Sequence, residues 1–254
     1  MTDLSGKHAL VTGGGTGVGE TVALTLAKAG AKVTISGRRA EPLAEVAAKS
    51  DAIEYVTADV TNEDSVRDMY VAARKFHGHV DIVIPNAGAA ESAPMAKVTL
   101  EQWQRLIDVN LTGVFLTCRE ALADMRSRGW GRIIPIASIA GRKGYAYVVP
   151  YCSAKHGVIG LTRALAAETA KQNITVNAVC PGYMMTPLVE NSAQTIMDKT
   201  SLSREEALAS MVATNPQARM IETDEVAETI LWLCGPGSQS VTGQTISISG
   251  GETT

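Results

Sequence analysis

The sequence lacks any cysteine pattern that would bind zinc or build a disulfide framework. Its four cysteines lie far apart, with neither a CxxC motif nor a cysteine/histidine ligand spacing. Structural zinc sites and small disulfide-bonded domains both need closely spaced ligands of this kind. We therefore expect no metal site. We expect small buried side chains at the four positions, which are Cys118, Cys152, Cys180 and Cys234.

The chain also lacks blocks of basic residues and long apolar runs. Its formal net charge of −3 is spread along 254 residues, so a nucleic-acid groove or a face for anionic membranes has no electrostatic basis. No segment approaches the roughly 20 apolar residues of a membrane span, and the N-terminus has no apolar signal-peptide core. These absences predict a soluble, cytoplasmic protein that binds neither nucleic acid nor membrane.

No proline-, glycine- or serine-rich linker and no internal repeat divides the chain, so a single domain over residues 1–254 is expected. Short β-branched runs alternate with longer helical patterns, which predicts an α/β fold with βαβ units and a parallel sheet. About seven strands are expected, at residues 8–12, 32–36, 53–57, 81–85, 132–137, 175–180 and 244–249. The expected helices span residues 17–29, 41–49, 63–77, 100–126 and 151–171.

Residues 183–217 depart from this alternation. The segment is rich in methionine, carries helical patches and follows Pro181-Gly182 at the end of an expected strand. Open parallel sheets bind ligands beyond the carboxyl ends of their strands. The segment is therefore expected to be a lid over a substrate, with a surface helical insertion as the alternative.

A glycine-rich loop joins the first expected strand to the first helix. Glycines allow a tight turn and a close approach of the backbone to a pyrophosphate, and the free N–H groups of the helix N-terminus attract the anion. This position in a βαβ unit is the context of a dinucleotide-binding loop. The residues expected to bind the cofactor here are Thr12, Gly13, Gly15, Thr16, Gly17, Val18 and Gly19.

The end of the second strand indicates which nucleotide is bound. An NAD-preferring site of this fold places a carboxylate there for the ribose hydroxyls, but the run Ser36-Gly37-Arg38-Arg39 has no acid. Guanidinium groups suit a 2′-phosphate. We expect NADP(H) to be preferred over NAD(H), with Arg38 as the main contact, Arg39 beside it and Ser36 as a helper. In the alternative, both arginines only face solvent.

Tyr151 and Lys155 are four residues apart on an expected helix, so their side chains share one face. A free tyrosine has a pKa of about 10, which must fall by roughly three before the phenol exchanges protons near neutral pH. A neighbouring lysine cation supplies part of that change. The pair is a candidate acid/base, although the same spacing also occurs on ordinary half-exposed helices.

Further motifs agree with one family in order and spacing. Together with the glycine loop and the tyrosine–lysine pair, they make the whole chain resemble the short-chain dehydrogenase/reductase family, in its form of about 250 residues. The matching cofactor positions are Asp59, Val60, Asn86, Ala87, Gly88, Tyr151, Lys155, Pro181, Gly182 and Thr186. The matching catalytic tetrad is Asn110, Ser138, Tyr151 and Lys155.

This resemblance implies a single Rossmann-type domain with a doubly wound parallel sheet. It implies an oxidoreductase that acts on CH–OH donors with NAD or NADP and assembles as a homotetramer. In the implied mechanism Tyr151 is the general acid in reduction, while Lys155 lowers its pKa and holds the nicotinamide ribose. Ser138 is implied to bind the substrate oxygen, and Asn110 to position a water that links Lys155 to solvent.

The motifs are similar to those of 3-oxoacyl and polyketide ketoreductases, which favours NADPH-dependent reduction of a 3-oxoacyl thioester or a similar hydrophobic ketone. Arg142 and Lys143 either meet a substrate carboxylate or phosphate, or lie in a solvated loop. Where 3-hydroxybutyrate dehydrogenases grip a small carboxylate, this chain has Ala140 and Val148. Two alternatives stay open: an NAD-dependent secondary-alcohol dehydrogenase, for a hydroxysteroid, polyol, 3-hydroxy acid or aryl carbinol, and a non-catalytic nucleotide-sensing protein.

Two prolines depart from the family pattern. Pro85 replaces the first asparagine of the NNAG element, and Pro135 replaces a polar residue in the strand before Ser138. Each removes a backbone N–H from the end of an expected strand. We expect the two missing hydrogen bonds either to face each other on neighbouring strands or to be met by water.

Overall fold

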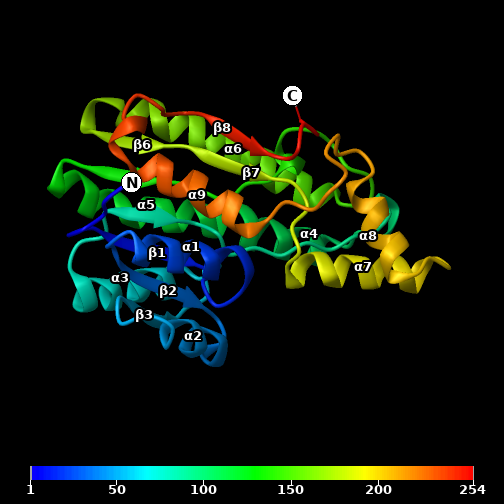
Figure 1. Ribbon diagram of the computed structural model, residues 1–254, viewed down its shortest axis with the longest axis horizontal. Coiled ribbons are helices and arrows are strands. Elements are labelled where there is room, and N and C mark those ends of the chain that lie inside the picture. The colour runs from blue at the N-terminus through cyan, green and yellow to red at the C-terminus, as the bar shows by residue number, and fades with distance from the viewer. Residues whose placement is uncertain (1, 254) are drawn as a thin grey trace.

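A parallel sheet forms the centre of the computed structural model, which describes residues 2–253 with the side chain of Leu188 excepted. Six strands run in the order β3-β2-β1-β4-β5-β6 (Figure 1). They are β1 (His8–Thr12), β2 (Lys32–Gly37), β3 (Ile53–Thr57), β4 (Ile82–Ile84), β5 (Gly131–Ile133) and β6 (Ile174–Val176). Two further strands, β7 (Ala178–Pro181) and β8 (Thr245–Ile248), pair with each other. The expected α/β class and parallel sheet are confirmed.

β1 lies inside the sheet, between β2 and β4, and helices cover both faces of the sheet there. All five of its residues are buried, as expected for a parallel strand inside an α/β fold. It pairs with β2 on one side, where His8 lies opposite Lys32, and with β4 on the other, where Ala9 lies opposite Ile82. The order of the strands reverses at this point, which creates a crevice at their carboxyl ends.

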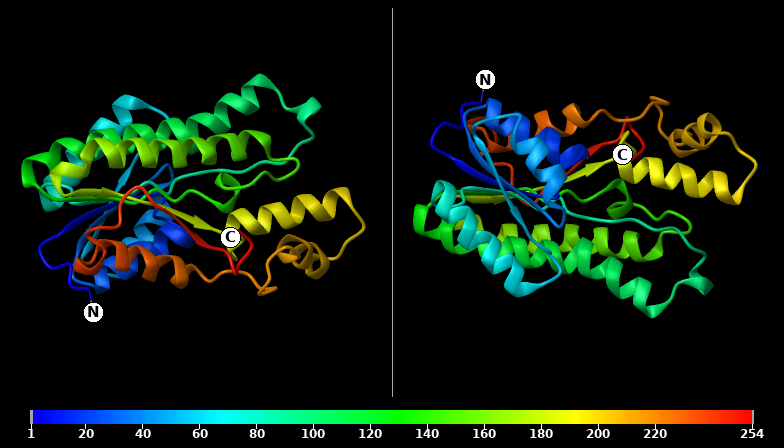
Figure 2. Two further views of the ribbon diagram at one scale, coloured as in Figure 1. Left: turned by 90° about the horizontal axis from the view of Figure 1, so that it is seen from above. Right: turned by 90° about the horizontal axis from the view of Figure 1, so that it is seen from below.

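Two helix layers enclose the sheet (Figure 2). One layer holds α1 (Gly17–Lys28), α2 (Ala40–Ala47) and α9 (Thr223–Cys234), and the other holds α3 (Glu63–His77), α5 (Gly113–Arg128) and α6 (Val149–Thr169). Val22 of α1 and Ile230 of α9 pack into the first apolar core, while Met69 of α3 and Val158 of α6 pack into the second. These two layers make the sheet doubly wound, as predicted.

The expected helix over residues 100–126 is divided, so the expectation of one long helix is wrong. α4 (Leu100–Ile107) and α5 are separated by a π-helical turn at Asp108–Thr112, with Asn110 at its centre. π-helical turns interrupt helices frequently at functional sites. The turn therefore draws attention to Asn110.

Residues 183–217 form two helices that project beyond the sheet, α7 (Pro187–Lys199) and α8 (Arg204–Val212) (Figure 1). Val189 and Ala193 of α7 pack against Ala207 and Met211 of α8 in a small apolar cluster of their own. The excursion is therefore a structured unit attached to the end of β7.

Pro85 follows β4 and leaves one position of the β1 ladder without a donor. Asp81 N donates to His8 O, and the two-residue spacing of such bonds would bring residue 85 to the carbonyl of Thr12. The side chain of Asn86 takes that place, with Nδ2 2.9 Å from the Thr12 oxygen. An amide side chain thus replaces the missing backbone donor.

Pro135 interrupts the sheet on the other side, toward β6. Ala137 N donates to Val179 O at 2.8 Å, so by the same spacing residue 135 would donate to Asn177. At that position the expected single strand over residues 175–180 divides into β6 and β7, and β5 is shorter than expected. The expectation that the two proline gaps face each other is wrong, because they open toward different neighbouring strands.

The four cysteines are buried and free, as expected. Within residues 2–253, no group of three or more histidine, cysteine, aspartate or glutamate side chains is placed to hold a metal ion. None of the described helices has the length and apolar character needed to cross a membrane.

His8 begins β1 at the amino edge of the sheet. Its ring is buried, with Nδ1 3.0 Å from Gly78 O and Nε2 2.9 Å from Thr34 Oγ1. Burial lowers the pKa of His8 to about 4; the hydrogen bond with Gly78 opposes this change, and the neighbouring His77 adds to it. His8 is therefore neutral over the range in which a free histidine titrates.

We expect acid to destabilise the protein through His8. An unfolded histidine binds a proton below about pH 6.5, whereas folded His8 does so only near pH 4. The unfolded state therefore binds more protons in this window, and the free energy of unfolding falls by up to about 3 kcal/mol. Denaturant titrations across the window should show this loss. His8→Gln should flatten the dependence of the free energy of unfolding on pH. The control His156→Gln, at an exposed position, should not. Equal pH dependence in wild type and His8→Gln would contradict this role of His8.

Candidate functional site

The predicted site residues gather at the carboxyl edge of the sheet, from which α7 projects (Figure 1). The loops that follow β1, β4, β5 and β7 carry Gly13, Asn86, Ser138 and Gly182, and α6 carries Tyr151. Ligands of open α/β sheets bind at this edge, where the strand order reverses. The sequence motifs thus converge on one crevice.

The glycine loop between β1 and α1 allows close approach of its backbone. Gly13 and Gly17 have φ angles of 66° and 57°, in the left-handed region that favours glycine. A Cβ on Gly19 would lie 2.2 Å from the carbonyl oxygen of Gly13. Thr16, at the N-cap of α1, makes no side-chain capping hydrogen bond among the described residues. Open N–H groups above a glycine cradle fit a dinucleotide pyrophosphate.

The side chains of Thr12 and Asn86 brace this loop. The Thr12 hydroxyl accepts the N–H groups of Asn86 and Ala87 at 3.0 and 3.1 Å. Asn86 Nδ2 donates to the carbonyls of Thr12 and Gly13 at 2.9 and 3.1 Å. Their polar atoms therefore hold the loop in shape, and they are engaged with the protein itself.

Other predicted cofactor residues act through packing. A Cβ on Gly15 would lie 3.2 Å from Pro42 at the start of α2. Val18 and Val60 are each only 7% exposed. These positions shape the backbone around the loop, while their own side chains stay covered.

The expectation that the Ser36 hydroxyl helps to bind a 2′-phosphate is wrong. Ser36 is fully buried, and its hydroxyl has no hydrogen-bond partner in the part of the chain that the structure describes. The Ile35 side chain lies under the glycine loop, 2.6 Å from the position that a Cβ on Gly14 would occupy. Side chains alternate along a strand, so Ser36 points to the opposite face. Ser36 contributes its carbonyl, which accepts the Gly14 N–H at 3.1 Å.

Arg38 and Arg39 are both exposed where β2 ends. Asp59, near the end of β3, accepts the N–H and the hydroxyl of Thr61 at 2.9 and 2.7 Å. The pKa of Asp59 is lowered, first by the Thr61 N–H and also by the charge of Arg38, while burial opposes the change. Arg38 and Asp59 therefore lie near each other at the carboxyl ends of β2 and β3, where the phosphate of an adenosine would bring negative charge.

Tyr151, Ser138 and Lys155 meet at the crevice. The Ser138 hydroxyl lies close enough to that of Tyr151 to lower its pKa, and Ser138 Oγ accepts the Ala140 N–H at 3.1 Å. Lys155 Nζ donates to the Ile136 carbonyl at 2.8 Å and lies 5.6 Å from the centre of the Tyr151 ring. The structure thus brings together three of the four predicted catalytic residues.

The pKa values of these groups differ from the sequence-based expectation. Burial raises the pKa of Tyr151 to about 12, and the hydrogen bond with Ser138 opposes the rise. Burial lowers the pKa of Lys155 to about 8. The expected lowering of the Tyr151 pKa by Lys155 is not met, because desolvation dominates and the ammonium faces the ring and the Ile136 carbonyl. At neutral pH Tyr151 is protonated, which is the state that a proton donor requires.

Asn110 is fully buried in the π-helical turn. Its Nδ2 donates to the carbonyls of Ala89 and Leu106 at 2.7 and 2.9 Å, and its Oδ1 accepts the Ala89 N–H at 3.3 Å. A Cβ on Gly88 would lie 2.8 Å from Asn110 Oδ1, so this approach requires glycine. These contacts anchor the loop after β4, and the water-positioning role of Asn110 stays a prediction.

The segment after β7 closes against the glycine loop. Pro181 is buried at the end of β7, and the Gly182 N–H donates to Ile248 O at 2.9 Å. The Thr186 side chain lies 3.3 Å from the place of a Cβ on Gly17. The predicted residues Pro181, Gly182 and Thr186 therefore line the crevice from β7 to the start of α7.

The loops after β4 and β5 are joined at Tyr147. Its carbonyl accepts the Ala93 N–H at 2.8 Å. Tyr147 has a φ angle of 68° and its side chain is 63% exposed. A left-handed backbone is rare for an aromatic residue. The two loops thus hold a strained, exposed tyrosine four residues before Tyr151.

Arg142 is exposed and Lys143 is partly exposed, in agreement with the expected solvated loop, but both side chains also bind partners within the protein. Arg142 Nη1 donates to Ser247 Oγ at 2.7 Å, and Lys143 Nζ lies 3.0 Å from Glu252 Oε1. The sequence reasoning missed Glu252. The sequence offers one signal for this residue: Glu252 is the only charged residue after Glu228.

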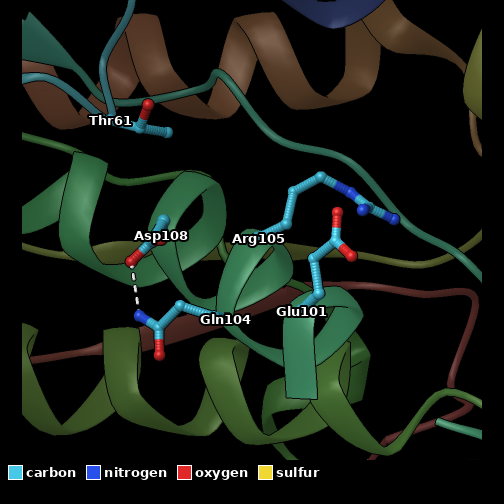
Figure 3. A pocket seen from close by; sticks show the side chains of 5 residues that line it. All are labelled: Thr61, Glu101, Gln104, Arg105 and Asp108. Carbon is cyan, nitrogen blue, oxygen red and sulfur yellow. Dashed lines mark hydrogen bonds between the residues drawn. The ribbon is translucent and has the colours of Figure 1, made fainter. Parts of the chain in front are cut away.

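A hollow of about 410 Å³ lies beside α4 and the π-helical turn (Figure 3). Its lining residues are Thr61, Glu101, Gln104, Arg105 and Asp108. Gln104 donates to Asp108, one helical turn further on, at 2.8 Å. Arg105 donates to Glu91 at the same distance. No predicted catalytic residue lines this hollow, so we do not assign the reaction to it.

Comparison with known proteins gives a consistent result. The family profile described as short chain dehydrogenase matches residues 7–197. A provisionally named ketoacyl reductase of Streptomyces coelicolor is 36% identical over 257 residues, which cover 99% of this chain and 98% of the relative. Two Rhizobium meliloti proteins are also 36% identical: a D-beta-hydroxybutyrate dehydrogenase, over 97% of this chain and 98% of its own length, and an acetoacetyl-CoA reductase, over 97% and 98%.

A solved structure has the same fold over the whole chain. A variant of the actinorhodin polyketide ketoreductase, crystallised with NADPH, superposes with a TM-score of 0.94 at 36% sequence identity. The match covers 100% of this chain and 99% of the other.

Proposed function

The chain belongs to the short-chain dehydrogenase family and is an oxidoreductase, and on this basis we propose that it reduces a 3-oxoacyl thioester, or a similar hydrophobic ketone, with NADPH. The meeting of Tyr151, Ser138 and Lys155 beside the glycine loop carries this proposal. The acetoacetyl-CoA reductase among the relatives supports the thioester class.

The chain's own residues would move and hold the proton. Tyr151 would donate its phenolic proton to the carbonyl oxygen, and Ser138 would stabilise the negative charge that develops there. Lys155 would keep a positive charge beside the Tyr151 ring. The nicotinamide, when bound, supplies the hydride. The glycine cradle, Arg38 and Asp59 would hold its nucleotide part.

The pairing of Arg142 and Lys143 argues for a neutral acyl chain over a small free carboxylate. Both cations contact the segment after β8, so a substrate carboxylate would have to displace those partners. Initial rates with NADPH and NADH, measured on acetoacetyl thioesters, steroids, sugars and aryl ketones, test the proposal. Inertness toward every 3-oxo substrate would reject it.

We expect the double variant Arg38→Ala/Arg39→Ala to lose its preference for NADPH. Charge-assisted hydrogen bonds to a 2′-phosphate contribute about 1.5–3 kcal/mol each, less where the arginines are solvent-exposed. The KM for NADPH should rise about tenfold to a hundredfold, while the KM for NADH, which has no 2′-phosphate, should stay within about twofold. Equal changes for the two cofactors would contradict a phosphate contact.

We propose that α7 and α8 form a lid over the substrate. Thr186 at the start of α7 contacts the glycine loop, and Lys199 at its end donates to Ser92 O at 3.4 Å. α7 therefore spans the crevice from the cofactor side to the loop after β4.

We further propose a cytoplasmic homotetramer. Phe115 on α5 is 44% exposed and Leu100 on α4 is 81% exposed, on the helices expected to meet between subunits. The four buried free thiols are consistent with a reducing compartment. Sedimentation velocity would test the assembly.

A further inference from the structure

Glu252 is a buried carboxylate that receives three donors. Its side chain is only 2% exposed. The Tyr145 hydroxyl donates to Oε1 at 2.6 Å, the Thr214 hydroxyl donates at 2.7 Å, and Lys143 Nζ lies 3.0 Å away. A carboxylate with so little exposure needs such partners to remain charged.

The three donors come from segments that bound the substrate side of the crevice. Lys143 and Tyr145 belong to the loop before Tyr151, and Thr214 follows α8 at the end of the proposed lid. Glu252 itself follows β8. The carboxylate is therefore the point at which the active-site loop, the lid and the C-terminal segment meet.

Close packing reinforces this junction. A Cβ on Gly250 would lie 2.1 Å from Asn215 Oδ1, and a Cβ on Gly251 would lie 3.3 Å from Pro216. Both glycines have positive φ angles, 61° and 90°. The turn before Glu252 thus fits against residues 214–216 only because Gly250 and Gly251 have no side chains.

Glu252 is linked through its Tyr145 partner to a second aromatic ring, that of Tyr183. The Tyr145 ring packs edge-to-face on Tyr183, with 6.5 Å between the centroids and 84° between the planes. Lys143 Nζ lies 4.9 Å from the Tyr145 ring centre, which adds a cation–π contact. Tyr183 directly follows Gly182, which lines the crevice after β7. The order of contacts is Glu252, Tyr145, Tyr183.

The carboxylate is charged at neutral pH. Burial raises the pKa of Glu252, but the hydrogen bonds from Tyr145 and Thr214 and the contact with Lys143 outweigh it, so the net change is downward. An ionised acceptor makes shorter and stronger hydrogen bonds than a neutral one. Tyr145 is therefore held in one place.

We propose that Glu252 is a positioning residue for substrate binding: it fixes Tyr145, and through Tyr145 the ring of Tyr183, as an aromatic wall for the acyl chain beyond the ketone. This inference rests on the proposed function. Glu252 does not itself reach the reacting atoms. It sets the shape of the pocket, and the same contacts tie down the end of the lid.

Glu252→Gln tests the role, because glutamine keeps the size of the side chain and removes the charge. We expect the KM for an acetoacetyl thioester to rise about tenfold, as for the loss of one charge-assisted hydrogen bond. The kcat and the KM for NADPH should each stay within about threefold, since neither the cofactor loop nor Tyr151 touches Glu252. Hydrogen exchange of residues 142–148 and 213–217 should become faster.

Tyr145→Phe is a milder variant that keeps the ring and removes only the hydroxyl bond to Glu252. It should raise the same KM, and the double variant with Glu252→Gln should be no worse than the worse single variant, since both remove one interaction. Glu228→Gln, at an exposed position in α9, is the matched control and should behave as wild type.

The outcomes separate the inference from the function on which it rests. If wild type turns over no 3-oxoacyl thioester, the proposed function fails, and the exchange rates alone decide on the positioning role. If wild type is active and Glu252→Gln matches the Glu228→Gln control in KM and exchange, the inference fails. A fall in kcat and in NADPH binding together, with a lower Tm, would show a general structural role and would also overturn it.

Discussion

Tyr151→Phe should lower the rate of ketone reduction by about 10²–10⁴-fold, the range for loss of a positioned general acid. Phenylalanine keeps the ring and removes only the hydroxyl, which lies beside Ser138 and carries the proton at neutral pH because its pKa is about 12. The dissociation constant for NADPH should change far less than the rate, since the glycine loop that cradles the pyrophosphate does not depend on that hydroxyl. Stopped-flow reduction and cofactor fluorescence titration measure the two quantities separately.

Tyr55→Phe is a suitable control for this variant. Tyr55 lies on β3 and is 38% exposed, away from the crevice. It should keep wild-type rates. More than a tenth of wild-type activity in Tyr151→Phe would show that another group supplies the proton.

Gly19→Ala should abolish cofactor binding in practice, with the dissociation constant for NADPH raised about 100-fold or more. A Cβ at this position would lie 2.2 Å from the Gly13 carbonyl oxygen and 2.6 Å from Asn86 Nδ2. This clash can be relieved only if the loop backbone moves. In a precisely arranged site, a displacement of about 1 Å can reduce the efficiency of the site about a hundredfold. Isothermal titration with NADPH measures the loss, and the Tm should fall as well.

Gly237→Ala is the matched control, because nothing lies within 4 Å of its Cβ position and its φ angle is not in the left-handed region. It should bind NADPH as wild type does. If Gly19→Ala also binds normally, the loop adapts without cost, and the close approach at Gly19 does not define the cofactor cradle.

The sequence predicted the framework well where local patterns and topology agree. β1, β3 and α3 have the predicted bounds, because apolar periodicity and turn residues fix them without help from distant parts of the chain. The crevice followed from the strand order, since the carboxyl ends of parallel strands share one edge. The glycine loop and the tyrosine–lysine pair were placed on that edge for the same reason.

The errors arise where distant partners decide the outcome. The Ser36 hydroxyl was misplaced because the face of a strand residue depends on the register of the whole sheet. The pKa of Tyr151 depends on burial by segments far along the chain, which no spacing of Tyr151 and Lys155 reveals. The partners of Arg142 and Lys143 were missed, because Ser247 and Glu252 lie more than a hundred residues away.

The left-handed backbone at Tyr147 limits how the loop before Tyr151 can be redesigned. A side chain with a Cβ in this conformation costs about 1–2 kcal/mol, except for glycine and, in part, asparagine and aspartate. Saturation mutagenesis at position 147 would therefore select on backbone strain as well as on the substrate. Glycine or asparagine should be enriched for stability alone, and valine or isoleucine depleted. A library at this position is interpretable only when each variant's Tm is recorded beside its rate.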